Sequence, residues 1–205
     1  MSDERIRLTI DSARYTTKPT SDDVRHITTR MKRNGPDEYT RADVMRAISE
    51  GHTIMCAAYV PHDGKGWGPF VSQRLIALDF DNKLPTLDDD GNPVRDEKGR
   101  IIMRMADRGE ALHITPWRAL DRCRHHLGLT PFACYPSMSD NRPEHHRFRL
   151  IIDMEEDIED EQEARDAIAW LLTEYPEADR MCSNPSRLSF PSRDGKLYYI
   201  EGWRA

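Results

Sequence analysis

Apolar residues recur along the chain in short blocks, and the spacing within each block indicates a strand or a helix. Residues 5–10 alternate polar and apolar positions, as a strand with one buried face does. Residues 75–78 read Leu-Ile-Ala-Leu, a continuous apolar run that is typical of a strand buried on both faces. The same reasoning predicts strands at 5–10, 53–60, 70–80, 132–135, 148–152, 187–190 and 197–200.

Other blocks carry their apolar residues at helical spacing. Thr40, followed three residues later by Asp43, has the pattern of a capping box and predicts a helix that ends at Gly51. Thr115 followed by Pro116 marks another helix start, because proline is favoured at the first helical position. The predicted helices cover residues 22–33, 40–50, 116–127 and 160–174.

Residues 84–110 interrupt this order. Two turn signals there, at 88–93 and 96–99, flank short apolar pieces and predict a surface insertion built as a hairpin. Elsewhere strands and helices alternate, with hairpin-like spacing near the end, so we expect an α+β protein with a mainly antiparallel sheet. With no linker long enough to divide the chain, 1–205 is expected to be a single domain with an N-terminal αβ subregion at 1–60.

Composition excludes several classes of protein. A chain of 205 residues is long enough to bury a core without disulfides. Its four cysteines form no Cys-x-x-Cys pair, which favours buried free thiols over a zinc site. No apolar run approaches the ~18 residues of a membrane span, and no secretory signal follows the first residues. We therefore expect a cytoplasmic protein that does not contact a membrane.

The charge of the chain is unevenly distributed. The net charge is −6, but the segment from Asp153 to Asp166 holds nine acids and one arginine. That segment carries −8, so the other residues carry a net +2. A mildly basic remainder keeps nucleic acid among the candidate partners, with the acidic segment 155–166, predicted to be mainly helix, turned away from it.

Two aspartates, Asp79 and Asp81, stand two residues apart at the end of the predicted strand 70–80. Residues at this spacing share one face of a strand, at a point where we expect the strand to meet solvent. Two carboxylates so close repel each other unless a cation lies between them, and Mg²⁺ prefers such oxygens. The alternative is a pair of turn or capping aspartates at a strand end.

A second group of polar residues lies at 137–150. Arg147 and Arg149 share one face of the predicted strand, opposite Phe148, and two cations on one face predict an anion site. A solvated sheet face is the alternative. His145 and His146 are adjacent, so at most one of them points toward that site.

A third group begins with Asp179 and continues as Ser-Arg-Leu-Ser-Phe-Pro-Ser at 186–192. Taken together, the three groups resemble the motifs of the archaeo-eukaryotic primase superfamily, above all the primase-polymerase domains of phages and plasmids. The resemblance covers roughly residues 40–192. It includes Ala-Ile-Ser-Glu-Gly-His-Thr at 47–53 and Leu-Thr-Pro-Phe at 129–132. It implies a catalytic core with an antiparallel sheet like that of RNA-recognition motifs, flanked by helices.

The resemblance also implies a function, which is DNA-templated nucleotidyl transfer by a DNA primase or DNA polymerase through two metal ions. The implied catalytic and metal-binding residues, for Mg²⁺ or Mn²⁺, are Asp79, Asp81 and Asp179. The implied nucleotide-binding residues are Ser139, His146, Arg147, Arg149 and Arg187. The implied partners are single-stranded or primed template DNA, nucleoside triphosphates and a replicative helicase, in a bacterial host cytoplasm.

The sequence departs from the family pattern in places. Ser139 lies well upstream of His146, so which of residues 145, 146, 147 and 149 replaces the family's motif histidine stays open. Ser189 and Ser192 stand where the family often has Arg and Gly. No Gly-x-x-x-x-Gly-Lys-Ser/Thr motif is present, so a helicase would be a separate protein or fused outside this chain.

Three other interpretations compete with a polymerase. The first is a catalytically inactive primase-like module that binds nucleic acid or nucleotide in replication initiation. The second is a haloacid-dehalogenase-like phosphatase, which shares the Asp-x-Asp pattern but has Thr or Val where this chain has Lys83, and needs a parallel sheet. The third is a replication nickase, which needs paired histidines and a tyrosine on a helix, whereas Tyr198 and Tyr199 fall on a predicted strand.

Overall fold

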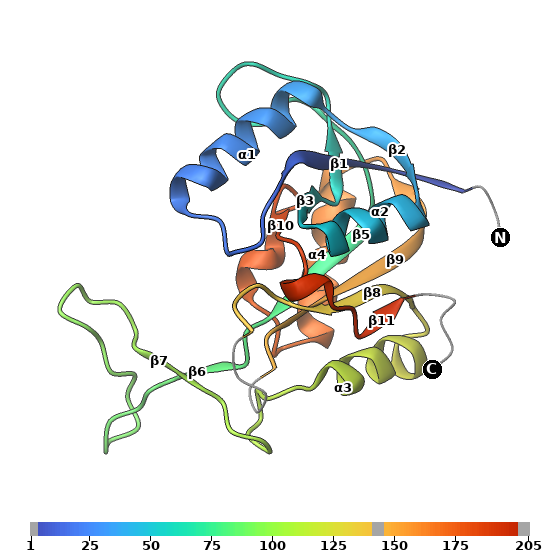
Figure 1. Cartoon of the computed structure of the whole chain (residues 1–205). Helices are drawn as coiled ribbons and strands as arrows, with labels where there is room; N and C mark the ends of the chain where they lie inside the picture. The colour runs from blue at the N-terminus through green and yellow to red at the C-terminus, as the bar shows by residue number, and fades with distance from the viewer. Residues whose placement is uncertain (1–3, 141–145, 201–205) are drawn as a thin grey trace.

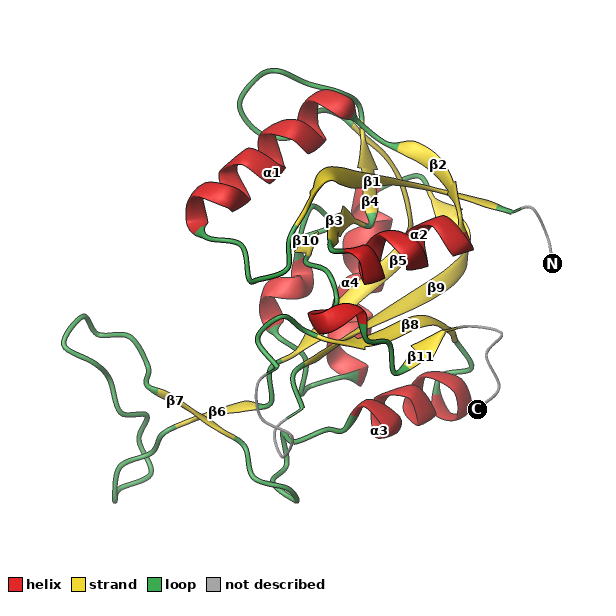
Figure 2. Cartoon of the chain, viewed as in Figure 1, coloured by secondary structure: helices red, strands yellow, loops and turns green. Residues whose placement is uncertain are grey.

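Two long strands lie side by side in the larger sheet of this computed structural model, which describes residues 4–140 and 146–200. They are β5 (Phe70–Phe80), which contains the apolar run, and β9 (Phe148–Ile158). The five-stranded sheet has the order β11-β8-β9-β5-β4, and every pairing in it is antiparallel. Its other strands are β4 (Ala57–Tyr59), β8 (Thr130–Pro136) and β11 (Tyr199–Ile200). The mainly antiparallel α+β class predicted from the sequence is confirmed (Figure 2).

A smaller antiparallel sheet of four strands lies against one face of the larger sheet (Figure 1). Its order is β10-β3-β1-β2. The strands are β1 (Arg5–Arg14), β2 (Asp37–Thr40), β3 (His52–Met55) and β10 (Leu188–Ser189). Helices α1 (Ser21–Asn34) and α2 (Arg41–Glu50) connect its strands. Both helices begin with a complete capping box, at Thr20 and at Thr40, and the box predicted at Thr40 is therefore confirmed.

The chain crosses between the two sheets at Cys56. The single strand predicted at 53–60 is in fact two strands, because β3 pairs in the smaller sheet and β4 pairs in the larger one. Near the C-terminus the chain returns, and β10 pairs with β3. The smaller sheet therefore combines strands from residues 5–55 with one from residues 188–189, and the larger sheet begins at Ala57.

Alternating residues of β5 face different cores. Ile76, Leu78 and Phe80 pack with helices α3 (Pro116–Asp121) and α4 (Glu161–Glu174). Leu75 packs on the opposite face, against the smaller sheet and α2. Asp79 has the parity of Leu75, so its side chain lies between the two sheets. This burial on both faces explains the continuous apolar run in the sequence.

The helix predicted at 116–127 continues beyond α3 as a π-helical turn, η1 (Arg122–His126). Two short 3₁₀ helices lie near the C-terminus, η2 (Arg180–Ser183) and η3 (Arg193–Gly195). None of the helices in the described part of the chain is both long and apolar enough to cross a bilayer. All four cysteines are buried free thiols, as the sequence predicts.

The acidic segment differs from the expected helix. Residues 153–158 belong to β9, and α4 begins only at Glu161. Asp153 is fully buried and forms ion pairs with Arg41 and Arg74, so its charge does not contribute to an acidic surface. The exposed acids of β9, which are Glu155, Glu156 and Asp157, lie six to eight residues from Arg149, or about 20–26 Å along an extended strand.

The segment 84–110 contains a two-stranded hairpin that extends away from both sheets (Figure 1). Strands β6 (Lys83–Pro85) and β7 (Met103–Met105) pair, and none of the residues between them is buried. Ala106, in contrast, is fully buried, and its N–H donates to the Asn82 carbonyl at 2.8 Å. The projecting part, called the arm below, is therefore residues 86–102, which is shorter than the expected insertion at 84–110.

We predict that residues 86–102 can be replaced by an Asn-Gly turn without loss of the fold. Pro85 and Met103 are register partners, so a two-residue turn closes the hairpin directly. The free energy of unfolding, measured by urea denaturation, should change by less than about 1 kcal/mol, because the deleted residues bury no core side chain. Loss of a cooperative unfolding transition would show that the arm belongs to the core.

Candidate functional site

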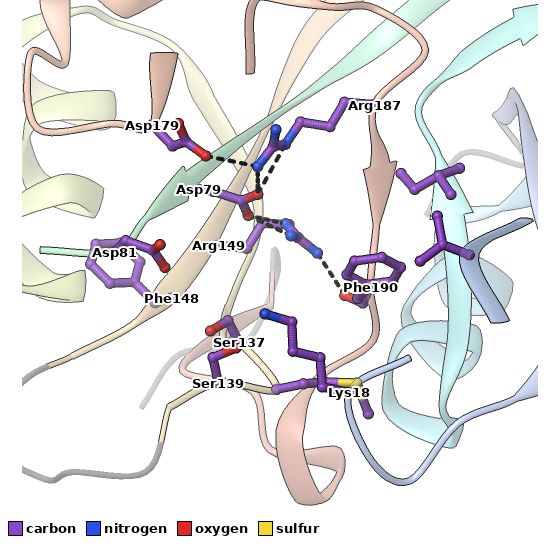
Figure 3. A pocket seen from close by; sticks show the side chains of 13 residues that line it. Lys18, Asp79, Asp81, Ser137, Ser139, Phe148, Arg149, Asp179, Arg187 and Phe190 are labelled. Atoms are coloured by element: carbon purple, nitrogen blue, oxygen red, sulfur yellow. Dashed lines mark hydrogen bonds and ion pairs between the residues drawn. The ribbon is translucent and has the colours of Figure 1, made fainter. Parts of the chain in front are cut away.

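A cavity of about 340 Å³ lies between the two sheets, at the end of β5 (Figure 3). Six residues predicted or implied from the sequence as site residues line this cavity: Asp79, Asp81, Ser139, Arg149, Asp179 and Arg187. Its apolar walls include Val24, Phe148 and Phe190. The cavity therefore brings together side chains from five parts of the chain. These are β5, β9, the segment after β8, the residues between α4 and β10, and the stretch from the end of β1 into α1.

Asp79, Arg149 and Tyr135 form a row across three adjacent strands. Asp79 is the register partner of Arg149, and Arg149 is the register partner of Tyr135. The Arg149 guanidinium donates to Asp79 Oδ1 at 2.5 Å and to the Phe190 carbonyl at 2.6 Å. Its side chain is only 6 % exposed, and that of Asp79 is 15 % exposed. The expectation of a solvent-facing Asp79 is therefore wrong, because the smaller sheet covers it.

A second arginine reaches the other oxygen of the same carboxylate. Arg187 Nη2 lies 3.0 Å from Asp79 Oδ2 and 2.8 Å from Asp179 Oδ2, so one guanidinium bridges two carboxylates. Two further bonds position Asp179. Its N–H donates to the Asp79 carbonyl at 2.8 Å, and its Oδ1 accepts from Met181 N–H at 3.0 Å at the start of η2. The bridge joins two carboxylates that lie 100 positions apart in the sequence.

Asp81 is the most exposed of the three carboxylates. Its side chain is 41 % exposed and accepts a hydrogen bond from Lys83 Nζ at 2.8 Å. Arg147 Nε lies farther away, 4.0 Å from Asp81 Oδ1. Burial acts to raise the pKa of Asp81, but the hydrogen bond and charge of Lys83, with Arg147 and Lys18, hold that pKa below its usual value. Asp81 is therefore anionic at neutral pH.

Asn82 fixes the backbone that carries Asp81, a role that was not predicted from the sequence. It is 1 % exposed and has a left-handed φ of 47°, which asparagine tolerates. Its amide nitrogen donates to the carbonyls of Ile114 and His146, and its Oδ1 accepts from the Ile114 N–H at 2.9 Å. The only signal for it in the sequence is its place directly after the Asp-x-Asp pair.

The remaining sequence-predicted residues take different positions. Ser139 lines the cavity, whereas Arg147 and His146 are not among its lining residues. Arg147 borders the cavity through its approach to Asp81, and its N–H donates to Asp140 Oδ1. His145 lies outside the described residues. The nucleotide-binding roles given to Ser139, His146, Arg147, Arg149 and Arg187 stay predictions.

Two polar residues of the cavity were not predicted. Lys18 reaches it from the connection between β1 and α1, and Ser137 lies directly after β8. The Lys18 side chain stands in a Thr-, Ser- and Pro-rich segment that carries no pattern, so only the fold brings it to the site. Ser137 belongs to the same Ser-rich segment as Ser139.

The acidic residues fit a hard cation by their chemistry, although each is already paired with a positive side chain. Three carboxylates line one cavity, and oxygen donors of this kind bind Mg²⁺ or Mn²⁺. Within residues 4–140 and 146–200, no three His, Cys, Asp or Glu side chains are grouped closely enough to hold a metal ion. A cation at this place would therefore have to displace the bridging guanidinium of Arg187 and the ammonium of Lys83.

The protic groups beneath the carboxylates stay protonated at neutral pH. Burial raises the pKa of the Cys182 thiol and of the Tyr135 hydroxyl to about 12 each. The Cys182 sulfur accepts from the Asp79 N–H at 3.2 Å. These two side chains are therefore packing and hydrogen-bonding groups, and neither supplies a thiolate or phenolate nucleophile at pH 7.

We predict that Arg149→Met destabilises the fold far more than Arg147→Met. Removal of Arg149 leaves Asp79 Oδ1 without its donor and leaves the Phe190 carbonyl with only the longer hydrogen bond from the Tyr135 hydroxyl, which should cost about 2–4 kcal/mol of unfolding free energy. The Arg147 side chain is 20 % exposed and lies 4.0 Å from Asp81, so Arg147→Met should lower the free energy of unfolding by less than about 1 kcal/mol. Urea denaturation of both variants measures this, and equal midpoints would contradict the structural role of Arg149.

Comparison with known proteins leaves the site to be interpreted from its own geometry. No protein-family model, no curated protein and no solved structure matches the chain. The arrangement of Asp79, Asp81, Asp179 and Arg187 is therefore the basis for any functional conclusion.

Proposed function

We propose that the chain is a DNA-templated nucleotidyltransferase, a primase or polymerase of a phage, plasmid or other mobile element. The observation that carries this proposal is the convergence of Asp79, Asp81 and Asp179 on one cavity, with Arg187 between two of them. The sequence resemblance predicted that these carboxylates act together, although Asp179 is 100 residues from Asp79. An antiparallel sheet with helices on one face agrees with the catalytic core that the resemblance implies.

The three carboxylates would hold Mg²⁺ or Mn²⁺ when the enzyme is loaded. The metal would lower the pKa of the primer 3′-hydroxyl and stabilise charge on the phosphate under attack. Asp81 and Asp179 would provide the accessible oxygens, with side chains 41 % and 31 % exposed. Asp79 would keep one oxygen on Arg149, which holds that carboxylate in a single orientation. Arg187, released from the acids, would be free to face the triphosphate.

Partners follow from this proposal. The enzyme would bind single-stranded or primed template DNA and nucleoside triphosphates in the cytoplasm of a bacterial host, and would work with a replicative helicase. The exposed acids after Glu155 lie at the far end of β9 from the cavity. This position supports a template path that avoids them, because phosphate would be repelled there.

A second candidate function is a primase-like module that binds DNA or nucleotide without catalysis. One observation favours it, namely that both oxygens of Asp79 accept from arginines. In that case Arg187 would never leave the acids. The phosphatase alternative is disfavoured, because it requires a parallel sheet and every strand pairing among the described residues is antiparallel. The nickase alternative is disfavoured as well, since Tyr199 lies on β11 and Tyr198 immediately before it.

We predict that Asp81→Asn abolishes nucleotide incorporation and leaves the fold intact. Asp81 is exposed enough to tolerate the change, and its loss removes one charge from the acidic group. Incorporation on primed template with dNTPs and Mg²⁺ or Mn²⁺ should fall at least a hundredfold, about 2.7 kcal/mol in the barrier.

Asp89→Asn is the matched control, because Asp89 is an exposed acid on the arm away from the cavity. It should incorporate nucleotide at the wild-type rate. Full activity of Asp81→Asn with a normal melting temperature would refute the metal assignment. A wild-type chain that binds primed DNA but incorporates no nucleotide with either metal would favour the non-catalytic module.

A further inference from the structure

Lys18 contributes a positive charge to the cavity from the connection between β1 and α1. Both ends of this connection are fixed. The Tyr15 N–H donates to the Gly51 carbonyl at 2.7 Å, and Thr20 caps α1 through Asp23. Pro19 is buried beside the exposed Lys18, which anchors the backbone at the lysine itself. The lysine is therefore held at the cavity by the fold and is not on a loosely attached loop.

The other cations at the cavity are already neutralised by carboxylates. Arg149 and Arg187 pair with Asp79, and Lys83 pairs with Asp81. Lys18 makes no hydrogen bond or ion pair with any residue that the structure describes, although its charge is felt at Asp81. Among the described residues that line the cavity, it is the cation that stays available to a ligand.

An unused hydroxyl lies on the same wall. The Ser137 Oγ is buried and has no hydrogen-bond partner in the described part of the chain. Figure 3 shows the ammonium end of Lys18 pointing toward the side of the cavity that Ser137 and Ser139 line. A buried hydroxyl without a partner costs free energy, and an anion that accepts from it would remove that cost.

We propose that Lys18 binds a phosphate group in this cavity, with Ser137 as a second donor, so that the N-terminal part of the chain completes the substrate site. An ammonium and a hydroxyl on one wall, opposite a group of carboxylates, match a ligand that carries both phosphate and a bound cation. The phosphate belongs to a nucleoside triphosphate or to a DNA backbone. The identity of the ligand rests on the proposed function. Phosphate binding by Lys18, however, can be tested by binding measurements alone.

The test compares wild type with Lys18→Ala and Lys18→Arg, and with Lys65→Ala, an exposed lysine in the connection between β4 and β5, as the control. Sodium tripolyphosphate in EDTA, measured by calorimetry, reports the nucleotide source. Fluorescence anisotropy with primed DNA reports the backbone source. We expect Lys18→Ala to weaken one of the two about tenfold, Lys18→Arg to stay within about threefold of wild type, and Lys65→Ala to match wild type.

Loss of tripolyphosphate binding alone assigns Lys18 to the triphosphate, and loss of DNA binding alone assigns it to the DNA backbone. The proposal is overturned if Lys18→Ala changes neither affinity, if Lys65→Ala weakens binding equally, or if the wild type binds neither probe. Because no incorporation is measured, the result is separate from that of the polymerase assay. If the wild-type chain lacks polymerase activity but Lys18→Ala still weakens binding of tripolyphosphate or DNA, the phosphate site is supported. The proposed catalytic function is then rejected.

Discussion

The Asp79 carboxylate lies between two guanidinium groups under the smaller sheet, and the arrangement of the cavity depends on this contact. A carboxylate only 15 % exposed needs compensating charge, and Arg149 and Arg187 provide it on separate oxygens. Arg149 comes from the neighbouring strand, in register. Arg187 comes from the turn that leads into β10, so neutralising Asp79 also fixes where that turn lies.

The two sheets are joined through the same region. Cys56 separates β3 in one sheet from β4 in the other, and β10 brings the C-terminal part of the chain back onto β3. Arg187 immediately precedes β10, and Asp179 immediately precedes η2. The acids, the arginine that bridges them and Lys18 therefore come from parts of the chain that only this crossed arrangement brings together. A site built in this way requires both sheets to be folded.

The sequence predicts those features that depend on local periodicity. Strand β5, the capping box at Thr40 and the interior orientation of alternate residues follow from spacing alone. Strand β2 was missed, because Asp37–Thr40 is a short edge strand with no apolar alternation. The outer part of β9 was missed because the three residues that follow Met154, which are Glu155, Glu156 and Asp157, are exposed acids.

The candidate site was predictable only in part, for a related reason. The two-residue spacing of Asp79 and Asp81 predicts that they belong to a site, and the sequence resemblance implies Asp179 and Arg187. Long-range contacts decide the rest. Burial turns Arg149 into a partner of Asp79, Asn82 is tied to Ile114, and the connection after β1 brings Lys18 to the cavity. None of these contacts leaves a local pattern in the sequence.

The most direct test of the central claim is anomalous scattering from Mn²⁺ in crystals grown with a non-hydrolysable deoxynucleoside triphosphate. The account predicts a Mn²⁺ peak within about 2.5 Å of carboxylate oxygens of Asp81 and Asp179, with the Arg187 guanidinium moved from the acids toward the triphosphate. A nucleotide bound in the cavity with no Mn²⁺ peak, and with Arg187 still bridging Asp79 and Asp179, would contradict it.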